Sequence, residues 1–451
     1  MVSVILSTNR RVKVQALPPF QKRPYPMKLL YICYFSLREP LVETQVLAYL
    51  RQLADDGHQI WFMSFEPGWP DSWPDTEKQS TQARLAASGI QWIALKYHKR
   101  PSLPATMWDI AVGAWFARRL ARREGLQVIH GRAHVASAMG ALARWKKPQK
   151  LIFDIRGFNP EEYVDAGRWK AGGLKFRLMK ASERAIVRVA NGFVILTDAG
   201  REIMFPKAIA QNELGAWCLP DHRPIEVIPC CVNTSGYQKS SEISRDQAKH
   251  DQGLTGRRVV AYVGALGGWY MTDDMVKAWS IAKRQDPSSF ALIFTQSPKE
   301  PLIQSLIQAG LEENIDFRVQ KVAPSELPER LRAADIALSF IKPSYSKISS
   351  SPTKLAEYLA SGCVVVSTRK IGDCDAQLSK NNVGVLLDDM TDETIAQALK
   401  QAFQMASEPD IETRCRSTVD QLFDLKDVGG KRYKRLYKRL FQSSMDSNSI
   451  S

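Results

Sequence analysis

The sequence predicts an α/β fold of two tandem, doubly wound parallel-sheet domains that face each other across a cleft. At 451 residues the chain is too long for one hydrophobic core. Its strand-like segments are near-continuous apolar runs, as in parallel strands buried on both faces, and helical segments separate them. The same alternation starts again near residue 257, after a polar stretch. Two such sheets place the carboxyl ends of their strands at a shared cleft, where open α/β proteins bind ligands.

The first domain is predicted to span residues 27–237. It opens with the apolar strand MKLLYICYFS, followed by a helix that ends near Gly57 and by a second strand. Further strands are expected at LQVIHG, KLIFDIRG and GFVILT, with helices from about residue 133 and over 173–189. The segment VIPCCVNTSGY closes this half.

The second domain is predicted to span residues 257–425, after a linker at 238–256. Its first strand and turn are RRVVAYVGALGG, and strands at FALIFTQ, DFRVQ, IALSFI, CVVVS and GVLLDD follow in alternation with helices. A last helix at 426–442 has one apolar face and is expected to return to the first domain. Residues 1–26 and 443–451 are expected to be disordered.

The composition of the chain argues against several classes of protein. No run approaches the ~20 apolar residues of a membrane-spanning helix, and the first 26 residues lack the apolar segment of a secretory signal. Seven scattered cysteines without a Cys-x-x-Cys pair favour reduced thiols in the cytoplasm and support no metal site. The net charge of +15 suits a phosphorylated substrate, an anionic membrane or nucleic acid. Nucleic-acid binding ranks last, because no basic arm or nucleic-acid motif is present.

The stretch SSSPTKLAEYLASGCVVVST at 349–368 predicts a helix and then a buried strand, with Ser350 or Ser351 as the helix cap. Lys354 lies in the first turn, where a cation opposes the helix dipole at a cost of ~0.3–1 kcal/mol unless an anion is bound. Thr353 and Glu357 share one face, one turn apart. A phosphate at the helix start and a ribose at the glutamate would explain all three residues. From the pattern alone, this hypothesis and an ordinary capped surface helix are equal.

A glycine-rich turn, VGALGG, follows the first strand of the second half. Gly264, Gly267 and Gly268 would let a ligand approach the backbone closely. The position is that of the phosphate-binding turn in dinucleotide folds, although tight turns without ligands also use glycine. The spacing matches neither a Walker loop nor G-x-G-x-x-G.

Polar residues end two strands of the first half, in HGRAH and DIRGFNPEEY. Strand ends that face a cleft carry chemistry, and buried charges need partners. The candidate catalytic residues are His130, Arg132, His134, Asp154 and Arg156. The alternative is a local network that stabilises the loop.

Basic segments with aromatic residues, WFARRLARREG and RWKAGGLKFRLMKASERAIVR, suit an anionic membrane surface. For each segment alone, a solvated helix face is the simpler explanation. The pair Asp373 and Asp375 has the Asp-x-Asp form of some metal sites, but no other ligand cluster is near in the sequence, and a turn is expected.

Several of these segments together resemble family 4 retaining glycosyltransferases. SSPTKLAEYLASGCVVVST is similar to the donor-site motif of that family, and FDIRGFNPEEYVDAG, SERAIVRVANGFVILT, VIPCCVNTSGY and YVGALGGWY resemble further segments in the family's order. The resemblance covers about residues 27–440. It implies the GT-B fold of two Rossmann-like domains. It also implies transfer of a sugar from a nucleoside diphosphate sugar to a hydroxyl acceptor, with retention and without metal or other cofactor.

The resemblance also implies roles for residues. Glu357 matches the second glutamate of the Glu-x7-Glu motif, which holds the donor ribose. The first glutamate would fall at Ser349, which is therefore also expected to be a donor-binding residue. Ser350, Thr353 and Lys354 match the helix start at the donor phosphates, and the three glycines match the loop beneath the pyrophosphate. His130, Arg132 and His134 fall in the loop near the reacting sugar. The family's Arg and Lys after the glycine loop are replaced by GGWYMTDD, so Lys354, Arg156 or another base is expected to supply the charge.

The basic helices suggest a lipid-linked or otherwise anionic acceptor at the inner face of the cell membrane, as in assembly of surface polysaccharide or glycolipid. A sugar-nucleotide epimerase or phosphorylase of the same fold is the enzyme alternative. A basic nucleic-acid-binding protein is the alternative outside enzymes.

Overall fold

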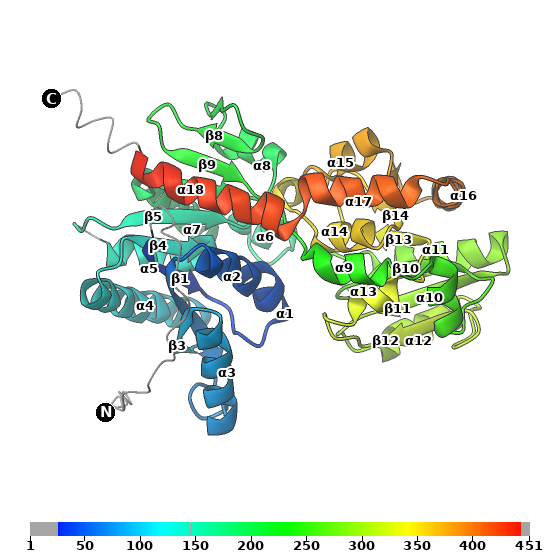
Figure 1. Ribbon diagram of the computed structural model, residues 1–451, viewed down its shortest axis with the longest axis horizontal. Helices are drawn as coiled ribbons and strands as arrows, with labels where there is room; N and C mark the ends of the chain where they lie inside the picture. Colours follow the sequence, from blue (N-terminus) through cyan, green and yellow to red (C-terminus); the bar gives the residue numbers. More distant parts are fainter. Residues whose placement is uncertain (1–25, 145, 443–451) are drawn as a thin grey trace.

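The computed structural model describes residues 26–144 and 146–442, and it contains two α/β domains that lie side by side (Figure 1). Of the tails predicted at 1–26 and 443–451, residues 1–25 and 443–451 lie outside the described residues. The first domain holds a nine-stranded sheet in the order β3-β2-β1-β4-β5-β6-β9-β8-β7. Its strands are β1 (Lys28–Cys33), β2 (Gln59–Pro67), β3 (Ile90–Tyr97), β4 (Val128–Arg132), β5 (Lys150–Ile155), β6 (Gly192–Ile195), β7 (Ile209–Ala210), β8 (Ala216–Cys218) and β9 (Pro224–Val227).

Helices cover both faces of this sheet, as the apolar strands require. They are α1 (Pro40–Val42), the π-helical turn η1 (Glu43–Leu47), α2 (Ala48–Asp55), α3 (Asp75–Ala87), α4 (Ser102–Glu124), α5 (Ala133–Ala143), α6 (Asn159–Asp165), α7 (Leu174–Val189) and α8 (Asp198–Met204). One core lies between the sheet and η1, α2 and α18, and the other lies under α4, α5 and α7. All strand pairs are parallel except those of the short β7 and β8, which add an antiparallel edge that the sequence did not predict.

The second domain is a six-stranded parallel sheet in the order β12-β11-β10-β13-β14-β15. Its strands are β10 (Arg258–Val263), β11 (Ser289–Phe294), β12 (Phe317–Gln320), β13 (Ile336–Ser339), β14 (Val364–Thr368) and β15 (Gly384–Leu387). The helices are α9 (Thr234–Ser240), α10 (Arg245–Asp251), α11 (Thr272–Gln285), α12 (Glu300–Gln308), α13 (Leu327–Leu331), the 3-10 turn η2 (Tyr345–Ser349), α14 (Thr353–Ala360), α15 (Cys374–Asn381), α16 (Asp392–Ala406) and α17 (Ile411–Leu422). In both sheets the strand order reverses beside the first strand, at β1/β4 and β10/β13.

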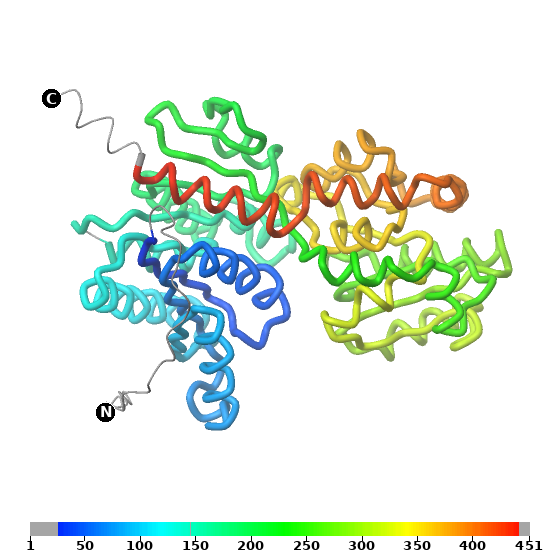
Figure 2. Tube along the Cα trace, in the orientation of Figure 1, coloured from blue at the N-terminus to red at the C-terminus, as the bar shows by residue number. Residues whose placement is uncertain are grey.

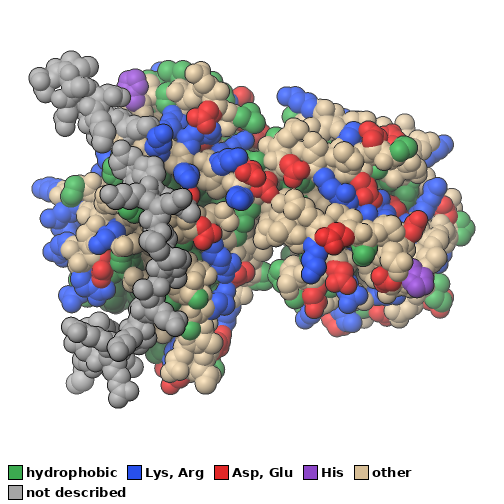
Figure 3. Space-filling model, in the orientation of Figure 1, with side chains coloured by type: hydrophobic (Ala, Val, Ile, Leu, Met, Phe, Trp, Pro, Cys, Tyr) green, Lys and Arg blue, Asp and Glu red, His purple; other side chains and the backbone are tan. Residues whose placement is uncertain are grey.

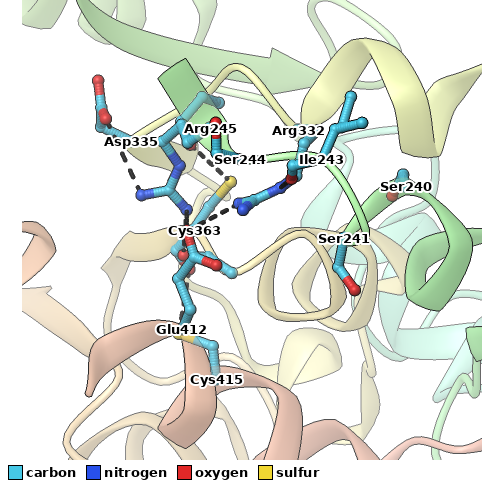
Figure 4. A network of polar contacts seen from close by, with 12 residues as sticks. Ser240, Ser241, Ile243, Ser244, Arg245, Arg332, Asp335, Cys363, Glu412 and Cys415 are labelled. Carbon is cyan, nitrogen blue, oxygen red and sulfur yellow. Dashed lines mark hydrogen bonds and ion pairs between the residues drawn. The ribbon is translucent and has the colours of Figure 1, made fainter. Parts of the chain in front are cut away.

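The segment predicted as a linker is helical and belongs to the second domain. α10 lies within it, and the side chains of Ala248 and Leu254 are part of the second core. Arg245 donates to the carbonyl of Gly362 at 2.8 Å and pairs with Glu412 at 3.2 Å (Figure 4). The polar composition that suggested a linker therefore serves contacts with the second domain.

After α17 the chain returns to the first domain. The π-helical η3 (Leu425–Gly430) leads into α18 (Lys431–Gln442), which lies beside β9 (Figure 2). Its apolar face, which includes Leu436 and Leu440, is buried in the first core. Among residues 26–144 and 146–442, none of the helices combines the length and apolar content needed to cross a bilayer.

Candidate functional site

The candidate site lies where the two domains meet, at the carboxyl ends of strands. η2 and the turn before α14 reach from the second domain to the first. The N–H of Phe158, after β5, donates to Oγ of Ser349 at 2.9 Å, and the N–H of Cys230, after β9, donates to Oγ of Ser351 at 3.0 Å. Strand ends beside the point where sheet order reverses are the usual ligand sites of open α/β sheets.

These contacts correct two predictions about the serines. The side chain of Ser349 is fully buried and also donates to the carbonyl of Ser346 at 2.9 Å, so both hydrogen bonds of its hydroxyl are made at the domain junction. Neither Ser350 nor Ser351 caps α14: Pro352 is in the cap position, and Ser351 accepts from the first domain. The amide groups of Thr353 and Lys354 consequently make no hydrogen bond to any described residue.

Lys354 is a buried cation without an anionic hydrogen-bond partner. It is 5% exposed, and its Nζ lies 3.2 Å from the hydroxyl of Tyr262 and 3.9 Å from the ring centre of Tyr270. A Cβ on Gly264, where φ is +140°, would lie 3.1 Å from Nζ. The structure therefore brings the glycine turn and the start of α14 together, and the lysine fills the space that glycine leaves.

Burial shifts the titration of two groups here. It lowers the pKa of Lys354 from its ordinary 10.5 to about 7, against the opposing effect of Glu357. It raises the pKa of Glu357 to about 7, with Lys354 acting in the opposite direction. No hydrogen bond to the Glu357 carboxyl is present in the described structure, and Thr353 lies one turn away at the helix start. An anion bound at α14 would restore the charge of the lysine.

Gly267 and Gly268 form the exposed tip of the glycine turn, with φ of +71° and +61°. The N–H of Gly267 donates to Oγ1 of Thr272, and the N–H of Leu266 donates to Oγ of Ser297 at 3.1 Å.

Directly beyond Ser297, a cavity of about 600 Å³ opens at the carboxyl ends of β11 and β12. Sequence analysis missed this cavity, because its lining comes from two loops that no motif marks. Its volume suits a small ligand.

The polar residues of the first domain form a buried network. Asp154 accepts hydrogen bonds from Tyr31 at 3.2 Å and from Tyr433 of α18 at 3.4 Å. His130 is fully buried and bonded through Nδ1 to the hydroxyl of Tyr437 at 2.7 Å. Burial lowers the pKa of His130 and by itself would raise that of Asp154, but Arg156, His130 and Arg132 lower the pKa of Asp154 below its usual range.

His134 does not join this network. Its Nε2 lies 2.8 Å from Glu183 of α7, and its ring packs edge-on against Phe153. His130 lies on β4 and bonds to Tyr437 of α18, whereas His134 lies on α5 and bonds to Glu183 of α7. The structure therefore does not bring the two histidines together at one position, as the sequence had predicted.

Asp373 joins the domains. Its carboxylate accepts the N–H groups of Asp198, at 2.7 Å, and Ala199, at 3.0 Å, at the start of α8. In the described part of the chain, no group of three or more His, Cys, Asp or Glu side chains could hold a metal ion.

Comparison with known families matches both domains. The model of the glycosyl transferase 4-like domain matches residues 42–212, and the model of glycosyl transferases group 1 matches residues 244–416. The chain belongs to the family 4 type of glycosyltransferases. The group 1 match includes Gly264 and all of α14, and the other match includes β4 and β5. None of the curated proteins matches the sequence.

Solved structures show that this glycosyltransferase has the GT-B fold. Sucrose-phosphate synthase from Thermosynechococcus elongatus has a TM-score of 0.68 at 15% identity, over 92% of this chain and 100% of that one. Anabaena HepE, solved with UDP-glucose, has a TM-score of 0.63 at 14% identity, over 91% and 100%. WaaG, a glycosyltransferase involved in lipopolysaccharide biosynthesis, has a TM-score of 0.59 at 14% identity, over 90% and 98%.

Proposed function

We propose that this glycosyltransferase moves a sugar from a nucleoside diphosphate sugar to a hydroxyl acceptor with retention, and that it needs no metal. Its donor diphosphate binds at the start of α14, and its donor ribose binds at Glu357. The observation that carries the proposal is Lys354, a buried cation beside two free amide groups at a helix start. Helix starts bind phosphate, and a lysine there is favourable only when an anion is present. HepE, of the same fold, was solved with UDP and glucose and with UDP-glucose.

In the proposed step the bond between the anomeric carbon and the diphosphate oxygen breaks, and the electron pair stays on that oxygen. The acceptor oxygen bonds to the anomeric carbon on the same face, and its proton passes to the leaving diphosphate. Lys354 and the free N–H groups of α14 stabilise the negative charge that develops. Exclusion of water at the domain junction favours the acceptor hydroxyl over hydrolysis.

Binding of donors by calorimetry tests this proposal. A screen of UDP-, GDP-, ADP- and dTDP-sugars should identify one donor, and Glu357→Ala should weaken its binding by about 10-fold or more, because hydrogen bonds to a charged group contribute about 1.5–3 kcal/mol. Glu393→Ala, at an exposed position of α16, is the matched control and should bind as the parent does. If Glu357→Ala binds the donor as tightly as Glu393→Ala does, Glu357 is not part of the donor site. Steady formation of an epimer from the donor alone, without acceptor, would reject transfer in favour of an epimerase.

The acceptor is proposed to be lipid-linked, in assembly of surface polysaccharide or glycolipid at the inner face of the cell membrane. α4 exposes Trp108 by 62% and Trp115 by 56%, and α7 exposes Leu174 by 73%. Lys and Arg side chains gather along the left edge of the first domain (Figure 3), and α4 ends in the basic segment ARRLARRE. Exposed aromatic and apolar residues beside basic ones favour an anionic lipid surface.

Sedimentation with phosphatidylglycerol vesicles tests the membrane proposal. Reversing the charges of Arg119 and Arg122 together should reduce vesicle binding at low salt about 30-fold or more, at ~1 kcal/mol for each basic residue near the surface. Reversing Lys380 and Lys400, exposed on the second domain, is the control with the same change in net charge. Absence of binding by the parent at low salt would refute the proposal.

A further inference from the structure

Arg156 is a second buried cation whose hydrogen-bonding capacity is unmet. It follows β5, and its side chain is 9% exposed. Nε and Nη1 make no hydrogen bond to any residue that the structure describes. Among the described residues, Nη2 contacts only the weak acceptor Sγ of Cys230, at 3.4 Å. Nη1 forms an ion pair with Oδ1 of Asp154 at 3.6 Å, which is beyond hydrogen-bonding distance, and that oxygen accepts no hydrogen bond from a described residue either.

The nearby carboxylate does not balance this charge. Arg132 also lies 3.7 Å from Asp154, so two guanidinium groups share one carboxylate. The other side chains around Asp154 are the phenols of Tyr31 and Tyr433 and the imidazole of His130, which burial keeps neutral by lowering its pKa. The cluster therefore keeps a net positive charge in a buried place, where an unpaired charge is costly.

Arg156 and Lys354 adjoin the same contact between the domains. Cys230, which touches Arg156, donates its N–H to Ser351 directly before α14. Burial raises the pKa of Tyr270, and Glu162 and the nearby thiol of Cys230 add to that effect. Nζ of Lys354 lies 3.9 Å from the ring centre of Tyr270. The carboxylate of Glu162 is already paired with Lys347 at 2.7 Å.

We infer that Arg156 binds the diphosphate of the donor from the first domain, opposite Lys354, and is a catalytic residue for departure of the diphosphate. The inference rests on the proposed function. A diphosphate carries enough charge for both cations and accepts the hydrogen bonds that Nε and Nη1 lack. Because one cation comes from each domain, the site for the leaving group is complete only when the domains are together.

The ratio of diphosphate to monophosphate affinity tests the inference. Calorimetry is run with UDP and UMP, or with the GDP–GMP, ADP–AMP or dTDP–dTMP pair if the donor screen selects that base. Arg156→Gln should weaken UDP binding by about 10- to 100-fold, from ~1.5–3 kcal/mol for a charged hydrogen bond, and UMP binding by less than about threefold. Arg156→Lys should recover part of the UDP affinity. A merely structural role would lower both affinities together and leave their ratio unchanged.

Arg201→Gln is the matched control. Arg201 is as deeply buried in the first domain, and its Nε also makes no hydrogen bond to a described residue. It is nevertheless paired with Glu202 at 3.0 Å and stacks on Trp217, so its loss should not change the ratio. An unchanged UDP affinity in Arg156→Gln, or a raised acceptor KM with UDP affinity intact, would overturn the inference and leave the proposed function standing. Absence of nucleoside diphosphate binding by the parent protein would reject both.

Discussion

Replacing Lys354 with methionine should stabilise the protein and at the same time abolish binding of a nucleoside diphosphate. The shift of the lysine pKa from 10.5 to about 7 corresponds to a cost of about 5 kcal/mol for the charged form, at 1.36 kcal/mol per unit. Cation–π contacts with the rings of Tyr262 and Tyr270 offset about 2 kcal/mol of this cost. Methionine has a similar volume, and such exchanges cost less than about 1.5 kcal/mol. A net gain of about 1–3 kcal/mol is expected.

The gain depends on pH in a defined direction. The pKa of Lys354 is lower in the folded protein than in the unfolded chain, so the unfolded chain binds the proton more tightly. The destabilisation is complete below about pH 7 and disappears as the pH rises to 10.5. At pH 6 Glu357 is mostly protonated, because its pKa is about 7, and the comparison then isolates the lysine.

Scanning calorimetry at pH 6 and pH 9, with and without UDP, measures both effects. At pH 6 the melting transition of the second domain should lie roughly 2–12 °C higher in Lys354→Met than in the parent, at ~2–4 °C per kcal/mol for a domain of that size, and the difference should shrink at pH 9. UDP at 100 times its Kd should stabilise the parent by about 2.7 kcal/mol and the variant not at all. A lower melting temperature of the variant at pH 6 would refute the view that this ammonium is desolvated and unpaired.

Three further changes test the domain junction and the returning helix. Gly372→Ala should destabilise by several kcal/mol, because φ is +50° and the new Cβ would overlap the carbonyl of Ser350; Gly253→Ala, with positive φ but open space, is the control and should cost about 1–2 kcal/mol in urea unfolding. Asp373→Ala should cost about 1–3 kcal/mol by removing two hydrogen bonds between the domains, and small-angle scattering should show a larger radius of gyration; an unchanged radius would contradict its role at the junction. Glu226→Ala should cost about 3–5 kcal/mol, since it leaves two arginines of α18 without their fully buried partner, and an unchanged urea midpoint would exclude that contribution.

Local patterns were sufficient for most of the elements. β1, β4 to β6 and the six strands of the second sheet lie inside predicted segments to within one residue, because a strand buried on both faces must be apolar along its length. The two- and three-residue strands β7 and β8 are too short to show periodicity. The segment of α10 is polar for a reason that lies elsewhere in the chain: Arg245 faces Asp335 and Glu412, which are distant in sequence.

The same distinction between local and long-range information applies to the residues of the candidate site. The unfavourable place of Lys354 in its helix, and the glycine after the first strand, could be recognised from the sequence, because helix dipoles and turn geometry are local properties. The buried position of His130 could not be recognised from the sequence, because its ring is hydrogen-bonded to Tyr437, 307 positions further along the chain. Ser349 is at the start of the same motif as Lys354, yet its hydroxyl is used by the domain junction.

Two parallel-sheet domains, the helix start with its lysine and the resemblance to family 4 can be derived from the amino-acid sequence. The three-dimensional contacts are needed to tell which polar groups have their hydrogen bonds met within the protein and which carry a buried charge that the protein does not neutralise. Asp373 and Ser349 are of the first kind. Lys354 and Arg156 are of the second kind, since Lys354 bonds only to a neutral phenol and Arg156 shares one carboxylate with Arg132. The physical reason is that burial and pairing depend on residues brought together from both domains, and an unpaired buried charge is recognised only when all its neighbours are known.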